Sequence, residues 1–213
     1  MKTNYLISKK DQLNMSCILY SKQNFLQAIF KCLPVKIIRH SERVRKLAGI
    51  MAAYVPKDLL PEDIDRVSYC FAVSKGAYYH DIGIYLAGNN IKKRPEAAEK
   101  LLLENGYDDI MDTYIKIVTE TVRNYRERCD AQGYPDGLST EKIPLHSAIC
   151  SIADAVDMIM STGLLKNKKA KRASAYIHQN SGIIFSHDAV SCFEQAQEKI
   201  FDIYTIQTSL KNV

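Results

Sequence analysis

One segment constrains the fold of this 213-residue chain more than any other. It runs from about Pro144 to Met160, and its central part, AICSIADAVDMIM, is apolar on nearly every face. A helix of that kind has to be covered by other elements on all sides. Clear strand alternation is absent, and nine glycines and six prolines supply too little turn chemistry for a many-stranded sandwich. We therefore predict an all-α fold, a helical bundle with this helix at its centre.

The length suits one domain with a single core. Residues 1–22 are polar and weakly periodic, so we expect a lead-in segment there and one helical domain over residues 23–213. Helical periodicity begins near Phe25, and prolines followed by acids predict helix starts at Pro61 and Pro95. The helix from Pro61 is expected to pack inward through Ile64, Val67, Phe71 and Tyr78. Later segments are expected as a helix over Asp108–Arg126, a basic connector over Lys166–Arg172 and two closing helices, the last of which starts near Ser186.

Composition argues against several classes of protein. The net charge of +5 is modest and no basic stripe with interleaved aromatics occurs, so we expect no duplex nucleic acid as a partner. The six cysteines form no C-x-x-C pair, which is typical of a reducing cytoplasm. The first residues lack an apolar signal-peptide core, and no run approaches about 18 apolar residues. We therefore predict a cytoplasmic protein without a membrane span.

Four residues have the chemistry to hold a metal ion. His40 lies four, seven and eleven residues before three apolar positions of one helical stripe, so it faces the core. His80-Asp81 ends an apolar helix, and Asp154 lies within the central apolar helix. Each of these residues could instead have a purely structural role. A lone core His is usually a hydrogen-bonded structural residue, and the buried acid could pair with an Arg or Lys. Together, two imidazoles and two carboxylates suit one divalent metal.

Two further observations bear on these four residues. Asp157 lies close to the face of Asp154 and could be the partner that orients a ligand histidine. A second His-Asp dipeptide, His187-Asp188, follows Ser186 at the start of the last helix. We interpret this second pair as capping chemistry, with an acid in the first helical turn, and not as a pair of ligands.

The four residues resemble the H…HD…D pattern of the HD-domain metal-dependent phosphohydrolases, and the resemblance extends from about residue 24 to the end. The segment YRERCDAQGYPDGLSTEKIPLHSAICSIADAVDMIMS is similar to the HD-GYP subfamily pattern HHE-x-x-DGxGYPxGL-x-x-x-x-IPLxARIxxxADxxDAxxS. The first ligand helix of that subfamily resembles HSERVRKLAGIMA in this chain, and its closing segment resembles SGIIFSHDAVSCFEQ. The resemblance implies an all-helical domain. HD-GYP members are cyclic di-GMP phosphodiesterases with two or three metals.

The chain departs from that pattern at the positions that serve further metals. Ile84 replaces the Lys of HDIGK, Arg94 the His of HPE, and Tyr125-Arg126 the paired histidines. Lys36 aligns with a Glu of trinuclear members. Family members also have a basic RPYK-like segment that contacts ligand phosphates. In this chain Gly163 stands at the position of its Arg, although Lys166 still provides one cation. The four-ligand minimum of the superfamily is left, so we expect one divalent metal, Fe, Mn or Zn, on His40, His80, Asp81 and Asp154.

The resemblance implies a phosphohydrolase with little or no cyclic di-GMP hydrolysis, acting on a phosphorylated small molecule or nucleotide. Asp81 would bind the metal and exchange a proton. Lys36, Arg94, Arg126 and Lys166 would hold anionic groups in a cationic pocket. The alternative is a non-catalytic module whose Gly133-Tyr134-Pro135 loop contacts a signalling protein. The same loop could equally be a plain turn in which Tyr134 packs against the domain. Cations that point to solvent, or that plug the site by salt bridges to Asp81 and Asp154, would make that module the leading interpretation.

Overall fold

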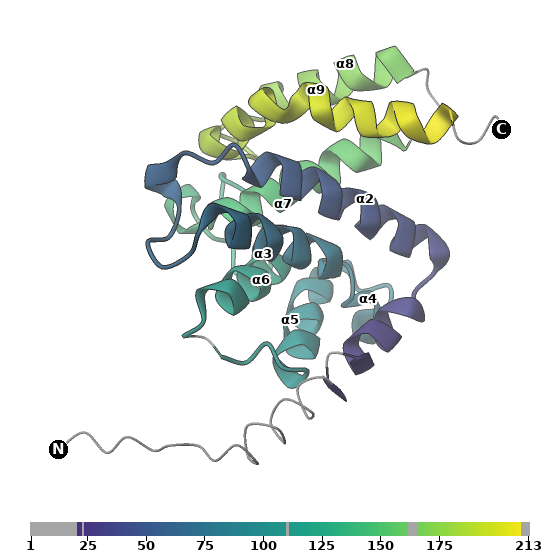
Figure 1. Cartoon of the computed structure of the whole chain (residues 1–213), viewed down its shortest axis with the longest axis vertical. Coiled ribbons are helices and arrows are strands. Elements are labelled where there is room, and N and C mark those ends of the chain that lie inside the picture. Colours follow the sequence, from purple (N-terminus) through teal and green to yellow (C-terminus); the bar gives the residue numbers. More distant parts are fainter. Residues whose placement is uncertain (1–20, 23, 110, 162–165, 210–213) are drawn as a thin grey trace.

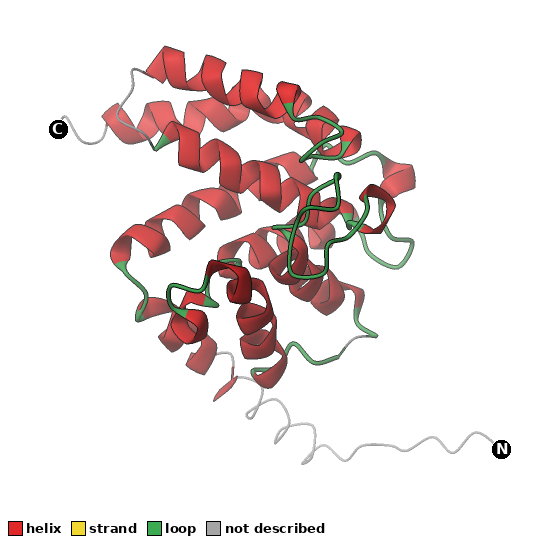
Figure 2. Cartoon of the chain, turned by 180° about the vertical axis from the view of Figure 1, so that it is seen from behind, coloured by secondary structure: helices red, strands yellow, loops and turns green. Residues whose placement is uncertain are grey.

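The computed structural model describes residues 21–22, 24–109, 111–161 and 166–209 (Figure 1). Residues 24–31 are helical, and the predicted lead-in lies almost wholly outside the described residues. The helices that follow are α2 (Val35–Ala52), α3 (Arg66–Tyr79), α4 (Ile84–Ala87), α5 (Arg94–Glu104), α6 (Thr113–Asn124), α7 (Leu145–Met160), α8 (Lys166–Gln179) and α9 (His187–Ser209). The described elements are helices and loops without a β-strand (Figure 2), which confirms the all-α prediction. None of the described helices is both long and apolar enough to cross a lipid bilayer.

Helix α7 lies at the centre of the bundle, as predicted. It contacts α2, α3, α6, α8 and α9 (Figure 1). Buried side chains occur on nearly every turn of it, and Met158 is a largely exposed residue of this helix (59%). The all-round apolar pattern therefore did indicate a covered helix.

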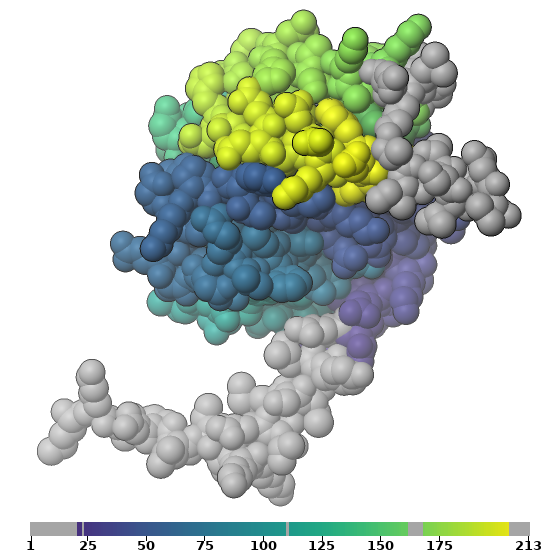
Figure 3. Space-filling model, turned by 45° about the horizontal axis from the view of Figure 1, so that its top comes forward, coloured from purple at the N-terminus to yellow at the C-terminus, as the bar shows by residue number. Residues whose placement is uncertain are grey.

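The helices that carry the candidate ligands pack side by side around α7. Helix α2 packs against both α3 and α7, and α3 packs against α6. Helix α9 lies along α2 and α7, so that α2 and α9 form one continuous face of the molecule (Figure 3). This packing brings residues that are more than a hundred positions apart in the sequence to the same place in the core.

The start and the inner face of α3 differ from the prediction. The helix begins at Arg66, because the carboxylate of Asp65 accepts hydrogen bonds from the backbone N–H groups of Val67 and Ser68 (2.8 and 3.0 Å). Val67 and Phe71 are 64% and 65% exposed, so the predicted face is wrong at these two positions, whereas Ile64 and Tyr78 are partly buried against the core.

Small residues explain the actual inner face of α3. Ala72, Gly76 and Ala77 are among its buried residues. A Cβ atom on Gly76 would lie only 2.5 Å from Cβ of Thr121 in α6. Close approach of the α3 and α6 backbones therefore decides the orientation, and Val67 and Phe71 are left on the outer face.

The expected basic connector is also wrong, because residues 166–172 form the first half of α8. Pro95 stands in the first turn of α5, as predicted. The next predicted helix is confirmed with a later start, since Asp112 caps α6 by accepting from the backbone N–H of Ile115 (3.1 Å).

Candidate metal centre

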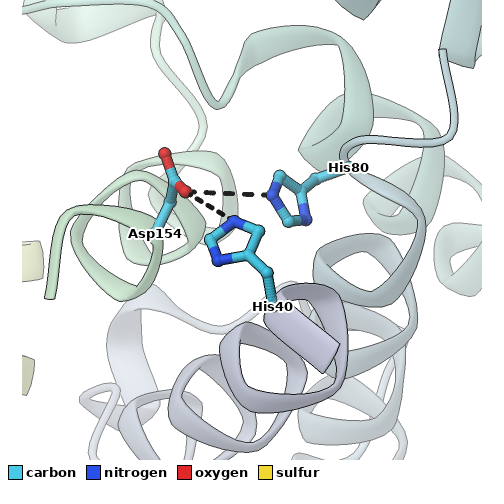
Figure 4. A group of neighbouring side chains, drawn as sticks. All are labelled: His40, His80 and Asp154. Atoms are coloured by element: carbon cyan, nitrogen blue, oxygen red, sulfur yellow. Dashed lines mark ion pairs between the residues drawn. The ribbon is translucent and has the colours of Figure 1, made fainter. Parts of the chain in front are cut away.

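Three residues from three helices meet at one point in the core (Figure 4). His40 comes from α2, His80 from the residue that ends α3, and Asp154 from α7. Nε2 of His40 lies 3.0 Å from Oδ1 of Asp154, and Nε2 of His80 lies 3.9 Å from the same oxygen. The candidate ligand atoms of the three residues all lie within 4.8 Å of one another. One ion between them could contact all three.

Asp81, the fourth predicted ligand, follows directly after His80. Its Oδ2 lies 3.7 Å from Nε2 of His80 and 4.0 Å from Nε2 of His40. Its Oδ1 accepts a hydrogen bond from the hydroxyl of Tyr125 (3.1 Å), which is itself buried. Tyr125 therefore holds Asp81 so that the other oxygen faces the imidazoles. Sequence reasoning missed this role, because it treated Tyr125 only as a lost histidine and no local pattern reveals a hydroxyl partner 44 residues away.

Nε2 of His80 is buried without a hydrogen-bond partner among the described residues, and Oδ1 of Asp154 has only its ion pair with Nε2 of His40 (3.0 Å). A buried polar atom left unpaired costs about 1–3 kcal/mol, so such atoms normally have a partner. Here both face the same small space. Imidazole nitrogens and carboxylate oxygens suit Zn, Mn or Fe, so the residues present fit a divalent metal.

Hydrogen bonds on the far side of each imidazole direct its Nε2 toward this space. Nδ1 of His80 lies 2.7 Å from the backbone carbonyl of Ala77, which can only accept, so Nδ1 carries the proton. Nδ1 of His40 lies 2.7 Å from Oδ2 of Asp157 and donates in the same way. With Nδ1 held in this way, Nε2 is the ring nitrogen of each histidine that faces a metal, an arrangement that is usual for metal-binding histidines.

Asp157 is the orienting partner that its position in the sequence indicated. Its fully buried carboxylate also accepts from Nε and Nη2 of Arg43 (2.6 and 2.9 Å) and from the hydroxyl of Tyr204 (2.6 Å). Burial alone would raise the pKa of Asp157, but the hydrogen bonds from His40, Arg43 and Tyr204 outweigh it and lower the pKa. Asp157 therefore stays charged and fixes the ring of His40.

The charges of the metal-free cluster are strongly coupled. Burial acts to lower the pKa of His40, but hydrogen bonds and charges from Asp154 and Asp157 raise it to about 9. Burial acts to raise the pKa of Asp154, but Arg126 and the two histidines lower it to about 2. Burial lowers the pKa of His80, which keeps that ring neutral and able to bind a metal. In the metal-free protein at neutral pH, a proton on His40 thus occupies part of the place that a metal would take.

The predicted cations are not gathered at the site. Arg126 is present there, with Nη1 3.0 Å from Oδ2 of Asp154. Arg94 instead donates from Nε and Nη2 to the carbonyl of Gly88 (3.1 and 3.0 Å), and Lys36 is exposed on α2. Lys166 begins α8, and its side chain lies outside the described residues. The pocket that we expected from all these cations is therefore not formed as predicted.

A cavity of about 450 Å³ lies beside the cluster, with Asp154 and Arg126 in its wall. Neither Lys36 nor Arg94 lines it. Arg128 and Arg172 do, and apolar and aromatic side chains supply much of the remaining wall. These are Tyr125, Tyr134, Ala155, Met158, Ile159, Tyr176, Ile184 and Phe185. An anionic group attached to an apolar or planar body would suit such a cavity.

The Gly133-Tyr134-Pro135 loop is tied to the segment that carries Arg126. The backbone N–H of Tyr134 donates to the carbonyl of Arg126 (3.2 Å), and a Cβ on Gly133 would lie 2.4 Å from Cα of Glu127. The buried carboxylate of Glu127 accepts from three consecutive backbone N–H groups of the loop, at residues 136, 137 and 138 (2.7, 3.2 and 2.9 Å). Tyr134 is half-buried and lines the cavity.

The second His-Asp dipeptide lies outside the cluster. His187 opens α9, its Nδ1 lies 2.8 Å from the hydroxyl of Ser181, and Asp188 stands in the first turn. The hydroxyl of Ser186 accepts from the backbone N–H of Ala189 (3.4 Å). The interpretation of this pair as helix-start chemistry is confirmed.

Comparison with known proteins gives consistent results. Residues 88–185 match the model of the HD domain family. A cyclic di-GMP phosphodiesterase of Thermotoga maritima is 32% identical over 177 residues, which cover 78% of this chain and 46% of that protein. The cyclic di-GMP phosphodiesterase response regulator RpfG of Xanthomonas campestris is 28% identical over 116 residues, 54% of this chain and 29% of that protein.

A cyclic di-GMP phosphodiesterase of Vibrio cholerae is 26% identical over 183 residues, 78% of this chain and 36% of that protein. The chain thus spans less than half the length of each of these curated relatives. The helical bundle, the clustered histidines and aspartates and these similarities lead to one conclusion. The chain belongs to the HD-domain superfamily and is of the HD-GYP-like type.

Proposed function

We propose that this protein is a metal-dependent phosphohydrolase with one divalent ion held by His40, His80, Asp81 and Asp154. The observation that supports this most is Nε2 of His80, which is buried without a hydrogen-bond partner among the described residues and converges with Nε2 of His40 on Oδ1 of Asp154. A site that had been closed by mutation would be expected to satisfy its buried polar atoms internally. Here the histidines are already turned in the orientation that a ligand needs.

The residues around the site then take distinct roles. A divalent ion supplies a Lewis acid and activates water for attack on phosphorus. Asp157 and the carbonyl of Ala77 keep the proton of each imidazole on Nδ1. Asp81, held by Tyr125 through one oxygen, has its other oxygen free to take or return a proton. Arg126 and the neighbouring arginines of the cavity would bind phosphate oxygens.

One metal, rather than two or three, is part of the proposal. Where the HD-GYP pattern has paired histidines, this chain has Tyr125, whose hydroxyl bonds Asp81, and Arg126, whose guanidinium pairs with Asp154. Two metals can stabilise both the attacking and the leaving oxygen of a phosphodiester, and one cannot easily do both. We therefore propose that cyclic di-GMP is hydrolysed slowly or not at all, and that a smaller phosphoester or nucleotide is the substrate.

A non-catalytic module is the second candidate, and a specific observation favours it. Arg126 pairs with an acid of the site, while Lys36 and Arg94 do not reach the cavity. The rigidly held Gly-Tyr-Pro loop would then contact a signalling protein. We rank this second, because Arg126 uses only Oδ2 of Asp154 and leaves Oδ1 facing the histidines.

Metal analysis followed by a phosphoesterase screen distinguishes the metal-dependent phosphohydrolase from the non-catalytic module. Protein purified without chelator is assayed on p-nitrophenyl phosphate, its bis ester, nucleoside monophosphates and cyclic di-GMP. His80→Gln removes a candidate ligand, and His187→Gln removes the histidine of the other His-Asp dipeptide as a matched control. Turnover that is lost in His80→Gln and kept in His187→Gln supports the enzyme. Metal binding without turnover of any ester supports the module.

A further inference from the structure

Arg126 stands between the metal cluster and the cavity, and it contacts both. Its Nη1 lies 3.0 Å from Oδ2 of Asp154, and its side chain forms part of the cavity wall. Its Nε is buried without a hydrogen-bond partner among the described residues. A guanidinium has five N–H donors arranged to bind oxyanions in pairs. The contacts to Asp154 therefore do not exhaust the donors of this side chain.

The carboxylate of Asp154 would bind two cations at once, the guanidinium of Arg126 and a divalent metal ion. It is almost completely buried (3% exposed), and Oδ1 faces the imidazoles while Oδ2 faces Arg126. A divalent ion bound at Oδ1 would share this carboxylate with the guanidinium and would be repelled by it. In a buried site such repulsion is weakly screened. Arg126 would consequently lower the metal affinity of the His40, His80 and Asp154 cluster while the cavity is empty.

The cavity provides a second anion for Arg126. Three arginines and two acids line it, and both acids already have partners. Asp154 pairs with Arg126, and Glu127 accepts from backbone N–H groups of the loop. An oxyanion that enters would bind Arg126 and offset its charge. The hold of Arg126 on Asp154 would then weaken.

We propose that Arg126 couples metal binding to occupancy of the cavity by an oxyanion such as a phosphate group. The metal would bind weakly while the cavity is empty and more tightly once an anion has engaged Arg126. Linkage requires the reverse as well, so that bound metal tightens the anion. The inference rests on the proposed metal site, but it adds a requirement that a plain four-ligand site would not have.

Mn²⁺ binding by calorimetry tests this, with sulfate as the probe anion and sodium chloride at matched ionic strength as the reference. In the wild type, sulfate is expected to tighten Mn²⁺ binding at least about fivefold, the lower end of usual coupling between sites. Arg126→Gln is expected to bind Mn²⁺ about tenfold more tightly than the wild type without sulfate, and to show less than about a twofold effect of sulfate.

Two variants make the result interpretable. Arg45→Gln removes an arginine outside the cavity, one that pairs with Glu42, and should keep the sulfate effect on Mn²⁺. Arg126→Met keeps an unbranched side chain over the ring of Tyr125 and should behave as Arg126→Gln does, which secures the test if the Gln variant does not fold. Thermal shifts with Mn²⁺ provide a second readout.

The possible failures are distinct. If wild type and Arg126→Gln bind Mn²⁺ equally, or if sulfate acts equally on both, the coupling is refuted while the metal site stands. An absence of any sulfate effect in the wild type also refutes it. If neither protein binds Mn²⁺, Zn²⁺ or Fe²⁺ at all, the proposed function itself fails.

Discussion

Replacing Asp157 by Asn should weaken the fold and the metal site together. The carboxylate accepts four hydrogen bonds from His40, Arg43 and Tyr204, all between 2.6 and 2.9 Å. An Asn has the same shape but no charge, and one of its two terminal atoms donates instead of accepting. At least two of the bonds are lost, and hydrogen bonds to a charged group contribute about 1.5–3 kcal/mol each. Because Arg43 is partly exposed and can bond to water, we expect a net loss of about 3–5 kcal/mol.

Guanidinium denaturation of chelator-treated protein measures this loss directly. In a thermal scan the same change corresponds to a fall of about 10 °C for a domain of this size. The ring of His40 would also lose the partner that fixes its orientation. Mn²⁺ affinity measured by calorimetry should therefore fall about 10–100-fold, as is usual when such a partner is removed.

Asp202→Asn is the matched control, because Asp202 is an exposed acid on α9, the helix that also carries Tyr204. It should change neither stability nor metal affinity. If Asp157→Asn costs less than about 1 kcal/mol, the range of ordinary surface changes, and Mn²⁺ affinity is unaffected, the assigned role of Asp157 is refuted.

Four more expected outcomes concern Glu127, the charge of His40, proton release on metal binding and cyclic di-GMP. Glu127→Gln should lower the melting temperature by about 5–10 °C, because one of three loop N–H groups loses its acceptor; exposed Glu141→Gln should not, and equal melting curves would contradict this. The raised pKa of His40 (about 9) means that the metal-free protein holds a proton there between pH 6.5 and 9 that the unfolded chain lacks, so its stability should fall as pH rises through that window. Metal binding at pH 7.5 should accordingly release about one proton, seen as a dependence of the calorimetric enthalpy on the buffer's ionisation enthalpy; no such dependence would contradict it. Cyclic di-GMP should be hydrolysed slowly at most. Rapid hydrolysis that is abolished by Asp81→Ala would contradict the proposed single-metal site.

The central helix and the ligand cluster could be predicted from the sequence because both depend on short-range patterns. An all-round apolar helix must be central, and a histidine on an apolar stripe must face the core. Asp154 within such a helix requires a charged partner or a metal. These conditions hold however the other helices are arranged, which is why His40, His80 and Asp154 meet as expected.

Other features depend on tertiary contacts that no local pattern encodes. The inner face of α3 follows the small residues that let it approach α6, so that Phe71 is left outside. Arg94 finds a backbone carbonyl six residues before it rather than the site. The hydrogen bond from Tyr125 to Asp81 joins α6 to the end of α3 and becomes visible only once both are packed.

The number of metal ions per chain is the most direct test of the proposed single-metal site. Protein purified without chelator, loaded in turn with Mn²⁺, Zn²⁺ and Fe²⁺ and freed of excess metal, is measured by elemental analysis against protein concentration. We expect one ion per chain, reduced to near zero in Asp154→Asn and unchanged in His187→Gln. Two or more ions per chain, or one ion that persists in Asp154→Asn, would contradict it.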